Sequence, residues 1–180
     1  TAEQESLLVK AGTAEQEPSF FNEQQRGVIS AIAEATIPRT ETPGAIDAGV
    51  PRYIESMVRD WMRPDEQHVF MHGLEDLMAA AKRVHRAPFD ELSEPAKLQL
   101  LETLEKQAED APWYNLGFDL RANFGEEMPF ICMMKDLTIW GFFTSEVGAK
   151  QVLAYNPMPM AFDGDTPLDR GQSSWSGAVL

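Results

Sequence analysis

Two histidines stand at a spacing that metal sites use. His68 and His72 are four positions apart, so on a helix they share one face. Acidic residues that lie near them in the sequence are Asp65, Glu75 and Asp76. A metal site needs further ligands from another element, and the paired Glu-x-x-His motifs of di-iron bundles do not occur. Solvated histidines are therefore the favoured interpretation, and an independent metal-binding enzyme that uses His68 and His72 is the alternative.

Other reactive groups lack the context that their chemistry needs. The serines between Gly171 and Gly177 do not have the Gly-x-Ser-x-Gly spacing of a nucleophile elbow. Neither a Gly-x-Gly-x-x-Gly nor a Gly-x-x-x-x-Gly-Lys-Ser/Thr motif occurs, so we expect no flavin, NAD or nucleotide cofactor in this chain. The single cysteine, Cys132, lies in an apolar stretch that should raise its pKa and keep the thiol inert. We therefore predict no catalytic, cofactor-binding or metal-binding residues.

Composition excludes two classes of partner. Acidic residues outnumber Lys and Arg 29 to 15, and the net charge of −14 would repel a nucleic-acid backbone. No apolar run approaches the roughly 18 residues that cross a bilayer, so we expect no direct membrane span. With 180 residues, 43% of them hydrophobic, the chain is long enough for one buried core.

Helical signals recur along the chain. Apolar spacing and capping residues predict helices that begin at Asn22, Pro51, Asp65, Ser93, Glu126 and Ser145. The second of these should bury Ile54, Met57, Val58 and Trp61, and Pro64 should end it. Period-two alternation is not convincing anywhere. We predict an all-α fold, an irregular single-domain bundle of about five or six helices.

The two ends of the chain differ from its middle. Residues 1–19 are rich in Glu, Gln, Ala and Thr, which predicts a flexible acidic N-terminal arm. Residues 20–155 form the predicted helical domain, with an aromatic-rich loop at 111–125. Residues 156–180 are rich in Pro, Gly and aromatic residues, which predicts an extended C-terminal tail that packs on the domain or on a partner.

Two segments carry a resemblance to a known family. The first is 37–45 (IPRTETPGA), followed by 48–50 (AGV) and Tyr53-Ile54. The second is 137–148 (LTIWGFFTSEVG), followed by 153–159 (LAYNPMP). In order and spacing both resemble the signature segments of the gluconate 2-dehydrogenase subunit 3 family, from about Phe20 to Asp165.

The resemblance implies a non-catalytic small accessory subunit of an oxidoreductase complex. Its partner would be a large FAD-containing dehydrogenase subunit of the glucose-methanol-choline (GMC) type, with a cytochrome c subunit in many such complexes. These complexes oxidise gluconate, fructose, glucose or the 3-hydroxyl of glucosides, and the sequence leaves the sugar open. The family also implies a periplasmic location, reached by twin-arginine (Tat) export with a signal upstream of Thr1. A chaperone module for an unrelated partner is a further alternative.

The tail motif suggests where the partner binds. Many relatives have a glycine where this chain has Met160, and many have a cysteine near Asp165, where this chain has none. We therefore expect a noncovalent contact. The predicted partner-binding residues are Phe142, Phe143, Tyr155, Pro157, Pro159, Phe162 and Trp175.

Overall fold

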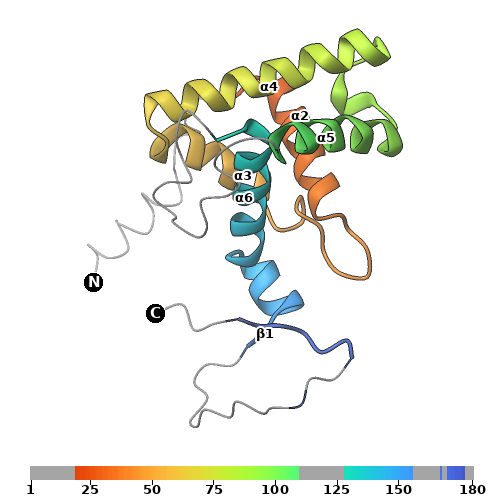
Figure 1. The fold of residues 1–180 in the computed structure, drawn as a ribbon. Coiled ribbons are helices and arrows are strands. Elements are labelled where there is room, and N and C mark those ends of the chain that lie inside the picture. Colours follow the sequence, from red (N-terminus) through yellow and green to blue (C-terminus); the bar gives the residue numbers. More distant parts are fainter. Residues whose placement is uncertain (1–18, 110–127, 156–166, 168–169, 177–180) are drawn as a thin grey trace, which may run out of the picture.

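The computed structural model describes residues 19–109, 128–155, 167 and 170–176, which fold mainly into helices (Figure 1). In chain order the helical elements are α2 (Glu23–Thr36), α3 (Val50–Ser56), the π-helical turn η1 (Met57–Trp61), α4 (Pro64–His85), the 3-10 turn η2 (Phe89–Glu91), α5 (Glu94–Glu109), α6 (Phe130–Phe143) and the π-helical turn η4 (Gly148–Val152). The strands β1 (Ala154–Tyr155) and β2 (Trp175–Ser176) pair in parallel. The predicted all-α class is confirmed.

Three sequence predictions fall on residues that the structure does not describe. Most of the arm at residues 1–19 lies outside the described residues, as do the aromatic-rich loop at 111–125 and most of the tail at 156–180. The division into arm, helical domain and tail therefore stays a prediction.

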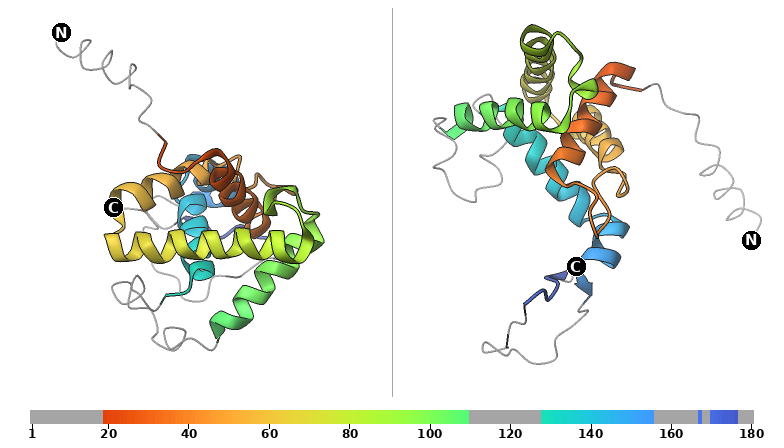
Figure 2. Two further views of the ribbon diagram at one scale, coloured as in Figure 1. Left: turned by 90° about the horizontal axis from the view of Figure 1, so that it is seen from above. Right: turned by 90° about the vertical axis from the view of Figure 1, so that its right-hand side faces the viewer.

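Helix α6 is the centre of the bundle. It contacts α2, α3, α4 and α5, and Figures 1 and 2 show it descending from beneath α4 and α5. Met133 and Met134 are completely buried, and Phe142 is buried at its other end. A helix covered on so many sides needs apolar residues around most of its circumference, and 130–143 supplies them with Lys135 and Asp136 as the only charges.

The start of α2 follows its sequence signals closely. Gln25 N donates to Asn22 Oδ1 at 2.9 Å and Asn22 N donates to Gln25 Oε1 at 3.0 Å, which is a reciprocal capping box. Phe21, just before the cap, is buried and packs against Phe70 of α4, with ring centroids 6.0 Å apart. The capping box therefore stabilises the first turn of α2, and Phe21 joins this end of the helix to α4.

Two expectations about the second and third helices are wrong. The second helix does end before Pro64, but α4 begins at Pro64 itself and not at Asp65. The missing N–H of Pro64 needs no partner in this first turn, and Glu66 Oε2 accepts a hydrogen bond from Arg63 N at 2.8 Å. Trp61 is 77% exposed and not part of the core. The reason is the π-helical turn η1, because its wider turn rotates the last residue away from the stripe that Ile54 and Val58 continue.

Candidate functional site

The first motif forms a loop tied to the end of α2. Glu34 accepts hydrogen bonds from Arg39 N at 2.8 Å and from Ile46 N at 3.1 Å. Asp47 accepts from Arg39 Nε and from the Arg39 terminal nitrogen, both at 2.6 Å, and from Gly44 N at 3.0 Å. The Gly44 N–H and the Arg39 guanidinium lower the pKa of Asp47. Two carboxylates therefore fix a loop that has little regular structure.

Glycines are required at two points of this motif. A β-carbon on Gly44 would lie 2.5 Å from Glu34 Oε1 and 2.6 Å from Arg39 N, closer than real contacts allow. Gly49 has φ +72°, the left-handed region that glycine favours, and it directly precedes α3. The first motif is thus a tight, hydrogen-bonded turn that leads directly into α3.

The second motif shapes the end of α6 and the turn after it. Ser145 Oγ donates to Phe142 O at 2.6 Å and accepts from Gly148 N at 2.9 Å, so it caps the following turn as predicted. A β-carbon on Gly148 would lie 2.1 Å from Phe142 O. This close approach keeps η4, and β1 after it, against the end of α6.

The two motifs meet in the core. The ring of Tyr53, in α3, lies over Gly141 in α6, and burial raises the pKa of the Tyr53 hydroxyl. Segments about 90 positions apart in the sequence therefore build one structural unit.

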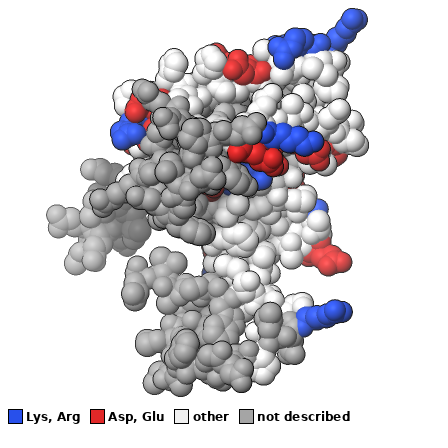
Figure 3. All heavy atoms as spheres, viewed as in Figure 1, with Lys and Arg blue, Asp and Glu red and all other residues white. Residues whose placement is uncertain are grey.

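One side of α6 in this unit carries exposed apolar residues. Ile139, Trp140 and Phe143 are 43%, 52% and 40% exposed. In Figure 3 the charged side chains gather mainly over α4 and α5, and the described atoms lower down α6 are mostly uncharged. We call Ile139, Trp140 and Phe143 the α6 face. Because large apolar side chains normally leave water, a group of three within one motif marks a candidate interaction surface.

The structure places the predicted partner-binding residues in different surroundings. Phe142 is 2% exposed and packs edge-on against Phe143, with ring centroids 5.2 Å apart. Tyr155 and Trp175 lie on β1 and β2, where Ala154 pairs with Trp175 and Tyr155 with Ser176. The structure thus brings the two short strands together, with β1 against η4. Pro157, Pro159 and Phe162 lie outside the described residues, and partner binding through this set stays a prediction.

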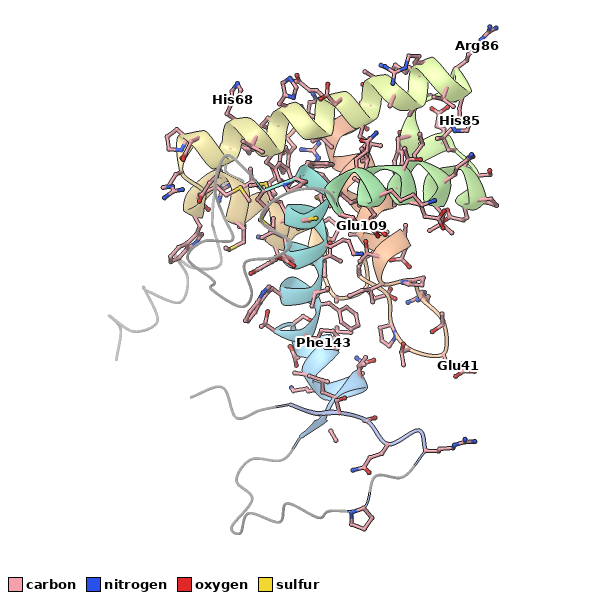
Figure 4. All side chains as sticks on the ribbon, viewed as in Figure 1. Glu41, His68, His85, Arg86, Glu109 and Phe143 are labelled. Atoms are coloured by element: carbon pink, nitrogen blue, oxygen red, sulfur yellow. The ribbon has the colours of Figure 1, made fainter. Side chains whose placement is uncertain are left out.

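Among the described residues, the histidine pair does not gather enough ligands for a metal site. His68 and His72 are both exposed, their rings stack at 6.3 Å, and His72 Nδ1 lies 3.1 Å from Asp76 Oδ2. Within the described ranges, no three His, Cys, Asp or Glu side chains form a possible metal site. In Figure 4, His68 points outward from α4 at the top of the view, whereas Phe143 lies at the lower end of α6.

Cys132 has the apolar setting that its sequence neighbours predict. The thiol is partly buried, and burial together with the nearby carboxylate of Asp136 raises its pKa to about 11. A thiol with this pKa is a poor nucleophile at neutral pH.

Sequence reasoning missed some exposed residues. Trp140 follows Leu137 by three positions and so fits the core stripe, and Ile139 carries no signal of its own. Spacing alone cannot tell a helix face that is buried by its own chain from one that is left open. The only sequence feature that could have pointed to Ile139 and Trp140 as surface residues is their position inside the second motif.

The comparisons with known proteins bear on this arrangement. A model of the family described as gluconate 2-dehydrogenase subunit 3 matches residues 23–161, which include both motifs. The chain belongs to this family. Members of the gluconate 2-dehydrogenase subunit 3 family are subunits of a dehydrogenase complex, so this chain is one as well. No curated protein and no solved structure matches this chain. Among the described helices of this family member, none is long and apolar enough to cross a membrane.

Proposed function

We propose that the chain is the non-catalytic small subunit of a periplasmic FAD-dependent sugar dehydrogenase complex. It binds a large catalytic subunit of the GMC type, stabilises it and helps its export by the twin-arginine route. The FAD and the oxidation of the sugar belong to the large subunit. Gluconate, fructose, glucose and glucosides oxidised at the 3-hydroxyl are the candidate substrates, and a cytochrome c subunit is the candidate electron acceptor.

The observation that carries the proposal is the α6 face. Ile139, Trp140 and Phe143 are exposed although they lie in a segment that the family model matches. Aromatic residues at protein interfaces often contribute most of the binding free energy, because they bury a large area with little loss of side-chain entropy. Because the chain belongs to a family of complex subunits, another subunit of the complex is the partner that would cover Ile139, Trp140 and Phe143.

The tail extends this surface in the proposal. β1 contacts η4, and η4 contacts α6, so the β1–β2 pair lies near the end of α6 at which Phe143 stands. Phe143, Tyr155 and Trp175 are then parts of one binding region, to which Pro157, Pro159 and Phe162 add. Phe142 supports the region from the core, where it holds the ring of Phe143.

The test is an affinity pull-down of the chain expressed together with its neighbouring genes. We expect a large partner whose absorption spectrum is that of bound flavin, and sugar-dependent dye reduction that the isolated chain lacks. The activity should appear in the periplasmic fraction, and only when the small subunit is present. A colourless chain with no partner and with stoichiometric bound metal would instead favour the alternative that uses His68 and His72.

A matched pair of variants tests the α6 face. Trp140→Ala with Phe143→Ala should weaken retention of the large subunit by at least about tenfold, which corresponds to about 1.4 kcal/mol. Val84→Ala with Leu98→Ala removes exposed apolar groups from α4 and α5 and should leave retention unchanged. Equal retention in both double variants would exclude the α6 face as the interface.

A further inference from the structure

Trp61 is exposed in a way that its local sequence does not require. It has the largest exposed fraction, 77%, of the large apolar side chains that the structure describes. It is the last residue of η1, where Met62 N donates to Met57 O at 3.0 Å, a bond that spans five residues. An α-helical continuation of α3 would have placed it on the buried stripe. A π-helical turn is a rare conformation and frequently marks a functional site.

A neighbouring helix holds this turn in place. The last carbonyls of a helix have no helical N–H partner, and Gln67 of α4 supplies a donor for two of them at the end of η1. Gln67 Nε2 donates to Val58 O at 2.8 Å and to Arg59 O at 3.2 Å. The outward direction of Trp61 is therefore set by a contact between two helices and does not depend on a partner. A side chain that is already positioned loses less entropy when it binds.

A hollow of about 310 Å³ lies beside this side chain. Its lining residues are Met57, Trp61, Met62, Arg63, Glu66 and Leu137. The two methionines are flexible and polarisable, so the walls can adapt to an inserted group. We call this feature the Trp61 hollow.

The charges at the Trp61 hollow neutralise each other. Arg63 and Glu66 form an ion pair at 3.0 Å, and Glu66 is otherwise buried. The chain as a whole has a net charge of −14, yet the hollow presents one paired cation and anion beside apolar walls. An uncharged, apolar side chain matches this lining, because a charged group would lose its water shell without gaining an unpaired counter-ion.

The Trp61 hollow and the α6 face share helix α6. Leu137 lines the hollow, and Trp140 stands three positions further along α6, so the two side chains are neighbours on the same side of that helix. The buried Leu137 and the exposed Trp140 therefore place the Trp61 hollow and the α6 face on neighbouring turns of one helix.

We propose that Trp61 is an anchor for the catalytic subunit, which inserts an apolar side chain into the Trp61 hollow. This inference rests on the proposed function and adds a second contact point to it. Tryptophan beside a pocket, with a polar margin, is the arrangement of residues whose truncation weakens complexes most. Gln67 is the positioning residue, since it acts through the π-helical turn.

The test measures the affinity of purified large subunit for variants of this chain. Trp61→Ala should raise the dissociation constant at least tenfold while the melting temperature of the isolated chain stays within error, because the side chain is exposed. Trp61→Phe should restore part of the affinity. Gln67→Leu should weaken binding through a changed π-helical turn, visible as a change in tryptophan fluorescence that is absent when Gln67→Leu is made in the Trp61→Phe background. Val84→Ala, an exposed apolar residue on α4, is the matched control.

Three outcomes would overturn the inference. An unchanged dissociation constant for Trp61→Ala, with wild-type complex still forming, removes Trp61 from the interface and leaves the proposed function standing. A large drop in the melting temperature of the isolated variant shows that another part of this chain occupies the hollow. A concentration-dependent dimer of the isolated chain that Trp61→Ala abolishes assigns the hollow to a second copy. Failure of wild-type chain to retain any large subunit contradicts the proposed function itself.

Discussion

The ring of Tyr53 lies so close to Gly141 that a β-carbon on the glycine would come within 2.5 Å of Tyr53 Cδ1. Tyr53 belongs to the first motif and Gly141 to the second, so this contact joins the two segments by which the family is recognised. A glycine inside a helix normally lowers its stability relative to alanine. Its presence here is explained by the close approach of α3 to α6.

Gly141→Ala should therefore destabilise the chain, although alanine is the better helix former. The added methyl group must push the Tyr53 ring and α3 away, and overpacking of this kind costs about 1–3 kcal/mol. Thermal or urea unfolding of the isolated chain measures the effect.

A second background tests whether the Tyr53 ring is the reason why Gly141→Ala destabilises the chain. In a Tyr53→Ala background the ring is gone, so Gly141→Ala should be neutral or stabilising by up to about 1 kcal/mol through helix propensity. An equal loss of stability in both backgrounds would show that the Tyr53 contact is not the reason for the glycine.

Asp47→Asn should destabilise the first motif at neutral pH and not in acid. The folded state lowers the pKa of Asp47 below its ordinary value of 3.8, so its contribution to stability is complete above that pH. The contribution is lost as the pH falls through the lowered folded pKa. Melting temperatures of wild type and variant should differ at pH 7 and converge below pH 3.8.

Asp60→Asn is the matched control for this prediction. Asp60 also pairs with an arginine, but Arg59 is its immediate neighbour in the sequence, so the ion pair closes no loop. We expect a much smaller difference in melting temperature. A difference at pH 7 that is as large as that of Asp47→Asn would contradict the role given to the loop.

Cys132 should be unreactive in the folded chain. Its pKa rises from 9.0 to about 11, so at neutral pH the thiolate fraction is about 100-fold lower than in the unfolded chain. Alkylation at pH 7.5 should therefore be at least about 100-fold slower before than after addition of urea. Rapid, stoichiometric labelling of native protein would contradict the buried setting.

His68→Ala combined with His72→Ala should have little effect. Both side chains are exposed, and surface substitutions of this kind change stability by about 0.5 kcal/mol or less. Retention of the large subunit and the metal content of the purified chain should both equal those of wild type. Loss of a bound metal ion together with activity would restore the alternative of a metal enzyme.

Local signals in the sequence predicted most of the helices because those helices depend on local chemistry. Asn22 with Gln25, Ser93 before α5, and Ser145 before η4 all stand where the helices or turns begin. The start of α4 was placed at Asp65, one residue late, because the sequence does not show that the proline that stops one helix also begins the next. The boundary was decided by Glu66, whose carboxylate accepts the Arg63 N–H.

The candidate site was harder to predict, since it depends on contacts between distant residues. Trp61 fits a buried stripe by spacing, and only the π-helical turn that Gln67 holds turns it outward. The hydrogen bonds that Glu34 and Asp47 accept in the first motif likewise could not be predicted, because no periodic pattern in the sequence marks them. Of the two residues predicted within the motif at 137–148, Phe143 is exposed and Phe142 is buried, and partner binding through them stays a prediction.

The central position of α6 also has a consequence for how the chain is made. The helices that contact it, α2, α3, α4 and α5, are all synthesised earlier, so each of them lacks one of its packing partners until residue 143 has left the ribosome. Folding must then wait for contacts of large sequence separation. We therefore expect a chain that stops before residue 130 to expose the apolar surfaces that α6 covers and to be cut by proteases faster than the full chain.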